Sequence, residues 1–198
     1  MSRRPFLLLT SRVDDALAEQ EREAFLRLTG LGADDVVHLR IEQGTFLPLD
    51  VTAYAGVVLG GSPFTVSEPR DSKSPTERRV EEELTVLIRE LVAREVPYLG
   101  LCYGIGATSL ALGGVVDRTY GEPVGSTTVR LTAAAADDPL FGGLPDTFTA
   151  FVGHKEAATE PPPGASGPTR TSATSGPTSR TPSSRPSVRP TCRRRTTC

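Results

Sequence analysis

The feature that most constrains the fold is an alternation of short apolar runs with helix-forming segments. Their apolar residues run together rather than alternating with polar ones, which is typical of strands buried on both faces of a sheet. We therefore expect an α/β fold with a doubly wound, mostly parallel sheet. The predicted strands occupy residues 5–11, 35–44, 54–63 and 97–102.

The segment 74–96 carries the clearest helix signals. Ser74 can cap the N-terminus, Pro75 suits the first helical position, and Glu77 can complete a capping box. The apolar residues recur at helical spacing and predict a buried stripe. They are Val80, Leu84, Leu87, Ile88 and Leu91.

Two further helices are expected, over residues 14–32 and 103–114. In the first, Leu17, Ala24 and Leu28 recur at helical spacing, and Gly30 can end the helix. Short strands are expected within residues 113–132, followed by a turn region at 137–148. The domain is expected to end at residue 164.

Composition changes abruptly in residues 165–198. This tail has no Asp, Glu, Lys, Leu, Ile, Phe or Tyr, and its seven basic residues are all Arg. The preceding 164 residues hold 15 Lys and Arg against 24 Asp and Glu, so an acidic body is joined to a basic tail. A disordered tail, a tail that binds an acidic partner, and a segment read out of frame are the three interpretations.

Cys102 lies within G-L-C-Y-G, between a predicted strand and a predicted helix. Such a turn lifts a nucleophile clear of the sheet, and the helix N-terminus favours negative charge on its sulfur. The Tyr103 N–H can stabilise an oxyanion, and Gly60 and Gly61 after the preceding strand can supply a second donor and let the backbone approach a substrate. Cys102 as a small buried residue is the alternative.

Three stretches resemble the class I glutamine amidotransferases in order and spacing, over roughly residues 5–164. They are "GVVLGGSPFTVSE", "VPYLGLCYGIGATSLALGGVVDR" and "AFVGHKEA". The resemblance implies a flavodoxin-like fold and the hydrolysis of glutamine or a γ-glutamyl amide, with release of ammonia through a thioester. It implies no cofactor and no metal.

The resemblance also implies roles for individual residues. Cys102 is the expected nucleophile, and Gly61 and Tyr103 are the expected oxyanion-hole donors. The "FVGHKE" segment resembles a loop whose backbone holds the α-amino and α-carboxyl groups of the substrate. The expected substrate-binding residues are Gly60, Gly61, Gly104, Val152, Gly153 and His154.

Two departures from the family pattern stand out. The pattern C-x-G-x-Q has Gly106 here in place of the glutamine. The His-x-Glu pair that would supply the base and orient it is missing, since no histidine follows His154 and no acidic residue follows Glu160. We interpret His38 as structural or partly exposed and Lys155 and Glu156 as solvated, and we do not expect His154 to replace the base.

The missing pair favours the out-of-frame interpretation of residues 165–198, because an Arg-, Pro-, Ser- and Thr-rich mixture without Lys is typical of GC-rich DNA read in the wrong frame. The C-terminal part of the domain would then be incomplete, leaving apolar surface exposed and the chain poorly soluble and nearly inactive.

Alternative functions are a cysteine hydrolase of the dienelactone-hydrolase type and a non-catalytic binding module that uses the same cleft. A small-molecule substrate and an ammonia-accepting synthase are the expected partners, with no nucleic acid and no membrane. No apolar stretch approaches the ~20 residues that span a bilayer, and with one cysteine in the body we expect a cytoplasmic protein.

Overall fold

The computed structural model describes residues 4–131 and 143–163. The predicted tail at residues 165–198 and the first part of the predicted turn region lie outside the described residues. The helices and strands are β1 (Phe6–Thr10), α1 (Asp15–Thr29), β2 (Val36–Arg40), β3 (Gly56–Leu59), α2 (Pro75–Ala93), β4 (Tyr98–Gly100), α3 (Tyr103–Ala111), β5 (Val115–Asp117), β6 (Glu122–Arg130), β7 (Thr147–His154) and β8 (Ala157–Glu160).

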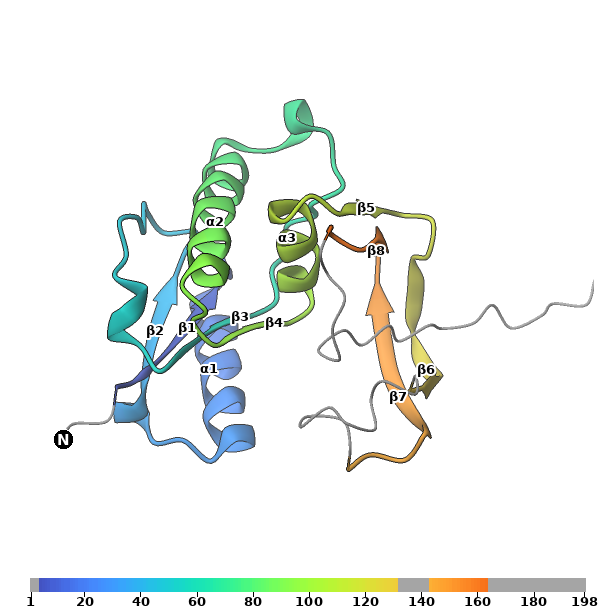
Figure 1. The fold of residues 1–198 in the computed structure, drawn as a ribbon, viewed down its shortest axis with the longest axis horizontal. Coiled ribbons are helices and arrows are strands. Elements are labelled where there is room, and N and C mark those ends of the chain that lie inside the picture. Colours follow the sequence, from blue (N-terminus) through green and yellow to red (C-terminus); the bar gives the residue numbers. More distant parts are fainter. Residues whose placement is uncertain (1–3, 132–142, 164–198) are drawn as a thin grey trace, which may run out of the picture.

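A four-stranded sheet forms the centre of the molecule, in the order β2-β1-β3-β4. Its neighbouring strands are all parallel. Helix α1 lies on one side of this sheet, and α2 and α3 lie on the other (Figure 1). The expectation of a doubly wound α/β fold with a parallel sheet is confirmed, and the carboxyl ends of β3 and β4 meet at one edge.

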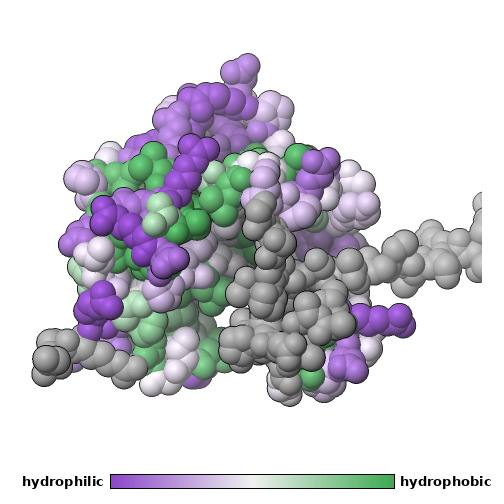
Figure 2. Space-filling model, viewed as in Figure 1, coloured by the Kyte–Doolittle hydropathy of each residue, from purple (hydrophilic) through white to green (hydrophobic). Residues whose placement is uncertain are grey.

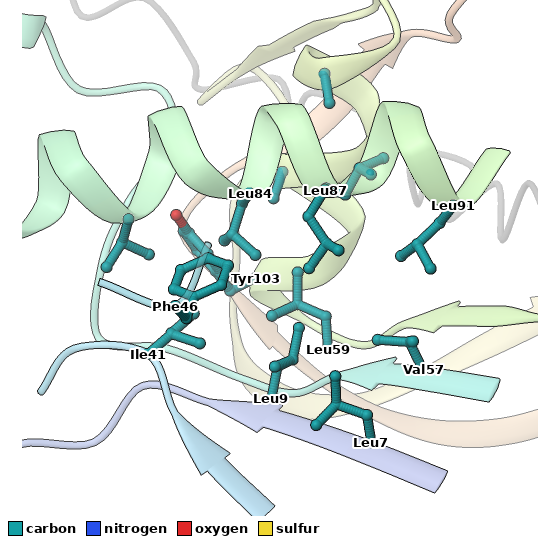
Figure 3. Close-up of a cluster of buried hydrophobic side chains, with 14 of the residues drawn as sticks. Leu7, Leu9, Ile41, Phe46, Val57, Leu59, Leu84, Leu87, Leu91 and Tyr103 are labelled. Carbon is teal, nitrogen blue, oxygen red and sulfur yellow. The ribbon is translucent and has the colours of Figure 1, made fainter. Parts of the chain in front are cut away.

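The main core lies between the sheet and α2. Leu84, Leu87 and Leu91 of α2 point toward the apolar side chains of β1 and β3 (Figure 3). Each fully buried leucine contributes about 1.5–3 kcal/mol relative to an exposed one. All five residues of the predicted stripe on α2 are buried. The N-terminal capping box between Ser74 and Glu77 is also confirmed.

Helix α1 begins and ends as the sequence predicts but is packed less tightly. Asp14 caps its N-terminus, and Gly30 ends it with a φ of 69°, a left-handed conformation that glycine adopts without strain. Leu17 and Leu28 are 54% and 81% exposed, so they do not form a buried stripe. Ala18 is the buried residue of this helix.

The strands are shorter than predicted, and the outer strand β4 is covered on one face only. Tyr98 packs against the core, whereas Leu99 and Leu101, which alternate with it, are 45% and 44% exposed. On the side of the molecule shown in Figure 2, apolar side chains also reach the surface of the α/β body, between polar ones.

Two pairs of antiparallel strands follow α3: β5 with β8, and β6 with β7. The strands expected within residues 113–132 are thereby confirmed. The β6–β7 hairpin lies to one side of the α/β body (Figure 1). None of the helices in the described ranges is long and apolar enough to cross a membrane.

Candidate active site

Cys102 occupies the sharp turn predicted between β4 and α3. Its φ is 54° and its ψ is −108°, and it is the N-cap residue of α3. A non-glycine residue in such a conformation costs on the order of 1–3 kcal/mol, and strain of this kind clusters at functional sites. The Cys102 side chain is exposed and reduced. The interpretation of Cys102 as a small buried residue is therefore wrong.

The two glycines that flank this turn allow α3 to pack closely on the sheet. A Cβ at Gly100 would lie 2.8 Å from the Gly104 carbonyl oxygen, and one at Gly104 would lie 2.8 Å from the Leu59 carbonyl oxygen. Both contacts are with backbone, which has little room to move. Gly104 is buried, so packing alone requires a glycine there, and its role in substrate binding stays a prediction.

The turn after β3 lies beside Cys102, as the common edge of parallel strands predicts. A Cβ at Gly61 would be 3.9 Å from the Cys102 Cβ. The positions that side chains at Gly60 and Gly61 would occupy are not open, however. A Cβ at Gly60 would lie 2.9 Å from Glu21 Oε1, and one at Gly61 would lie 2.9 Å from Arg12 Nη2. The side chains of Glu21 and Arg12 thus lie against these glycines, and the contact of Gly60 and Gly61 with a substrate stays a prediction.

Tyr103 has a backbone and a side chain in different environments. No hydrogen-bond partner is found for its N–H among residues 4–131 and 143–163. Its ring is buried, edge-on to Phe64 at a centroid distance of 6.3 Å. Burial raises the pKa of Tyr103, with smaller contributions from nearby carboxylates. The ring thus anchors the start of α3 in the core.

The predicted substrate loop is a strand in the structure. Val152, Gly153 and His154 end β7, and His154 pairs with Glu122 of β6. Every residue of β7 except Gly153 has a partner on β6, which a loop would lack, and Gly153 lies where the register shifts. The loop expectation is therefore wrong for residues 151–154, while their contact with a substrate stays a prediction.

Neither histidine is bonded to Cys102. His154 Nε2 lies 3.1 Å from Glu122 Oε2. His38 Nε2 lies 2.7 Å from the Thr10 hydroxyl, on the strand at the opposite edge of the sheet from β4. Burial lowers the pKa of His38, and the nearby Arg22 lowers it further. His38 is half-buried, which agrees with its interpretation as a structural or partly exposed residue.

Glu156 is not solvated as predicted, although Lys155 is exposed. Its carboxylate accepts hydrogen bonds from the Val66 N–H at 3.0 Å and the Ser67 N–H at 2.8 Å. These residues belong to the loop between β3 and α2, which also contains Gly61. Glu156 therefore ties the turn between β7 and β8 to the loop that lies beside Cys102.

A buried lysine holds the same loop from the other side. Lys73 Nζ donates to the Val66 carbonyl oxygen at 3.0 Å and pairs with Glu81 at 2.5 Å. Desolvation raises the pKa of Glu81 even though Lys73 lowers it. Neither Lys73 nor Glu156 was predicted as a site residue, because a charged residue does not show in the sequence which group its side chain will contact.

Gly106 occupies a crowded position. A Cβ there would lie 2.7 Å from Val66 Cγ2 and 3.5 Å from Glu156 Oε1. Val66 thus fills the space that a side chain at position 106 would need. A glutamine cannot be accommodated at this position without moving Val66, whose backbone is held by Glu156 and Lys73.

The structure also contains a pocket close to the start of α3. A pocket of about 180 Å³ lies between α2 and α3 and is lined by residues that include Glu81, Leu84, Tyr103 and Leu110. Cys102 is not in its lining. In the part of the chain that the structure describes, no three His, Cys, Asp or Glu side chains are grouped closely enough to hold a metal ion.

Comparisons with known proteins place this chain within a family. The family model for glutamine amidotransferase class-I matches residues 35–177. GMP synthase [glutamine-hydrolyzing] of Leifsonia xyli is 33% identical over 132 residues, which are 65% of this chain and 24% of that protein. The protein of the same name from Parafrankia is 36% identical over 112 residues, which are 56% of this chain and 18% of that protein. The chain thus spans about a quarter or less of these relatives.

Solved structures share the fold. A glutamine amidotransferase from Methylobacillus flagellatus has a TM-score of 0.61 at 21% identity, covering 81% of this chain and 59% of its own. One from Thermotoga maritima has a TM-score of 0.59 at 24% identity, covering 81% and 64%. The family match extends over most of the chain, includes the turn at Cys102, and agrees with the observed sheet. The chain belongs to the class I glutamine amidotransferase family.

Proposed function

We propose that Cys102 is the nucleophile of a glutamine amidotransferase site that cleaves the side-chain amide of glutamine or of a γ-glutamyl compound. One observation carries the proposal. Cys102 holds a strained, exposed conformation at the carboxyl end of β4 and the N-terminus of α3, beside the Gly61 turn. A buried structural cysteine has no need of such a conformation.

The chemistry follows from this geometry. The Cys102 thiolate attacks the amide carbon, and the carbonyl oxygen takes up the negative charge. The Tyr103 N–H, which has no partner within the described residues, stabilises this oxyanion. Collapse of the intermediate breaks the C–N bond and releases ammonia once the nitrogen is protonated. A water molecule then hydrolyses the thioester.

The ammonia requires an acceptor. The relatives named GMP synthase [glutamine-hydrolyzing] are about four or more times longer than the region they share with this chain. We propose that a synthase in another domain or another chain uses the ammonia released here.

We further propose that turnover by this 198-residue chain is impaired. A base must accept the proton of the thiol, and its conjugate acid must then donate a proton to the leaving nitrogen. Neither His38 nor His154 is bonded to Cys102 within the described residues. No histidine follows His154 in the sequence. We expect ammonia release from glutamine to stay at the level of Cys102→Ser. Release well above that level would refute the impairment.

The reading frame of the tail is a linked proposal. The family match continues to residue 177, within the segment that the composition separates from the body. Sequencing the gene from the codons for residues 161–165 through those for residues 178–198 tests it directly. A shifted frame that encodes a His-x-Glu segment supports the proposal, and an error-free frame without one ends it.

Gly106 favours a second candidate, a γ-glutamyl compound rather than free glutamine. Val66 fills the space beside Gly106, so the substrate meets an apolar surface where the family pattern has an amide. Protection of Cys102 from iodoacetamide distinguishes the two. Free glutamine should protect Cys102 if the first candidate is correct, whereas a γ-glutamyl anilide alone should protect it if the second is.

The same protection experiment tests the proposed function as a whole. Peptide mapping reports alkylation separately at Cys102, Cys192 and Cys198. Ligands of the site should slow the reaction at Cys102 and leave the two tail cysteines unaffected. Equal rates at Cys102 with and without both ligands would refute glutamine and γ-glutamyl compounds as the substrates.

A further inference from the structure

The backbone N–H of Gly61, one of the two expected oxyanion-hole donors, already has a partner. It donates to Glu21 Oε1 at 3.3 Å. Glu21 lies on α1, 40 residues away in the sequence, and its side chain is 24% exposed. A carboxylate oxygen thus lies on the donor beside Cys102 where a substrate oxyanion would need to bind.

Arg12 holds this carboxylate in place. Its Nε donates to Glu21 Oε2 at 2.9 Å. Arg12 follows β1, and its own carbonyl oxygen accepts a hydrogen bond from Arg40 Nη2 at 2.5 Å. The guanidinium also reaches over Gly61, since its Nη2 would lie 2.9 Å from a Cβ there. Arg12 is thus held beside β1, which it follows, and β2, which contains Arg40.

Glu21 and Arg12 can lie this close to the turn because Gly60 and Gly61 have no side chains. A Cβ at either position would contact Glu21 or Arg12 at 2.9 Å. From the sequence we expected these glycines to let the backbone approach a substrate, and in the structure the Arg12–Glu21 ion pair lies beside them. The Tyr103 N–H, by contrast, has no partner among the described residues. Of the two expected donors, the Gly61 N–H is thus hydrogen-bonded there and the Tyr103 N–H is not.

We propose that Glu21 is a positioning residue that keeps the Gly61 N–H occupied until a carbonyl substrate displaces it, with Arg12 retaining the displaced carboxylate. A hydrogen bond to a charged acceptor is stronger than one to a neutral carbonyl oxygen, so Glu21 competes with the substrate for the donor. Its negative charge also opposes the developing oxyanion. The proposal rests on the proposed role of Cys102 and Gly61.

The test uses two electrophiles that react at Cys102. Chloroacetone is a ketone, and negative charge forms on its carbonyl oxygen when the thiolate adds to the carbonyl carbon before the sulfur displaces chloride. Iodoacetamide reacts by direct displacement, which places little charge there. The ratio of the two rates therefore reports the oxyanion donors and is insensitive to general thiol reactivity. Neither probe carries the amino-acid groups of glutamine.

Glu21→Ala removes the competing carboxylate, and we expect the ratio to rise by about fivefold to tenfold. Glu21→Asp keeps the charge near Arg12 but is one methylene shorter, so it should give a ratio between those of the wild type and Glu21→Ala. Glu19→Ala is the matched control. Glu19 is on the same helix and pairs with Arg22 at the surface, and its loss should leave the ratio unchanged.

An independent readout is the Gly61 amide resonance in ¹⁵N-labelled protein. It should move upfield in Glu21→Ala and stay in place in Glu19→Ala. An unmoved resonance, or a ratio that is unchanged or lower in Glu21→Ala, overturns the proposal. If the ratio rises but glutamine and γ-glutamyl compounds fail to protect Cys102, the proposed substrates are wrong and the role of Glu21 stands.

Discussion

Replacing Cys102 with glycine should stabilise the protein while removing its nucleophile. Cys102 has a φ of 54° and a ψ of −108°, a conformation in which an L-residue crowds its own backbone. Glycine has no Cβ and adopts positive φ freely. The Cys102 side chain is exposed, so its removal forfeits little buried surface.

The size of the effect follows from two opposing terms. Relief of the backbone strain returns about 1–3 kcal/mol. The greater freedom of glycine in the unfolded chain costs about 0.5–1 kcal/mol. We therefore expect the free energy of unfolding to increase by about 0.5–2 kcal/mol relative to Cys102→Ala, which keeps the Cβ and hence the strain. The Tm should rise by about 2–4 °C per kcal/mol.

Urea unfolding of both variants measures this difference, and Glu95→Gly is the matched control. Within residues 4–131 and 143–163, Glu95 is the other non-glycine residue with a positive φ, also 54°, and it lies after α2, away from the turn at Cys102. Its replacement should stabilise the protein and leave alkylation of Cys102 unchanged. If Cys102→Gly is less stable than Cys102→Ala, the turn is not strained and the reasoning fails.

Three further predictions concern the surroundings of the site. Gly104→Ala should destabilise the protein by about 1–3 kcal/mol, because a Cβ meets the Leu59 carbonyl oxygen at 2.8 Å; an unchanged Tm would contradict this. Glu156→Ala should lower the free energy of unfolding by about 1–3 kcal/mol, because two loop N–H groups lose their carboxylate partner. Hydrogen exchange of those two amides should accelerate. Unchanged exchange would show that Glu156 does not hold the loop. Because burial lowers the pKa of His38 from 6.5, the unfolded chain binds its proton more readily, so stability should fall as the pH drops through and below 6.5. His38→Gln should reduce this dependence in urea unfolding, and an equal dependence in both proteins would assign it to other groups.

The sequence predicted the elements whose signals are local. The capping box at Ser74 and the five-residue stripe of α2 lie within one helix, so a single segment contains all the information. The glycines around Cys102 were equally informative, because a sharp turn between a strand and a helix needs them at fixed offsets. The predicted strands extend beyond the observed ones. A parallel strand ends where its hydrogen bonds to the neighbouring strand end, and the residues of one segment do not show this.

Contacts between distant segments were not predictable. The strand at Thr147–His154 pairs with β6; its Thr, Phe and Val residues are typical of a strand, but the family resemblance favoured a loop at its end. Glu156 binds the loop at Val66, 90 residues away, and Glu21 binds Gly61, 40 residues away. A charged residue gives no sign in the sequence of which backbone it will reach. These polar contacts determine the state of the loop beside Cys102.

We expect Cys102 to act as a nucleophile toward the side-chain carbonyl of a glutamine-like substrate. Incubation with a chloroketone analogue of glutamine, followed by peptide mass spectrometry, measures this reactivity. We expect one adduct on Cys102, none in Cys102→Ser, and slower labelling in the presence of excess substrate. Labelling that fails at Cys102, or that is equal at Cys102, Cys192 and Cys198, would contradict the account.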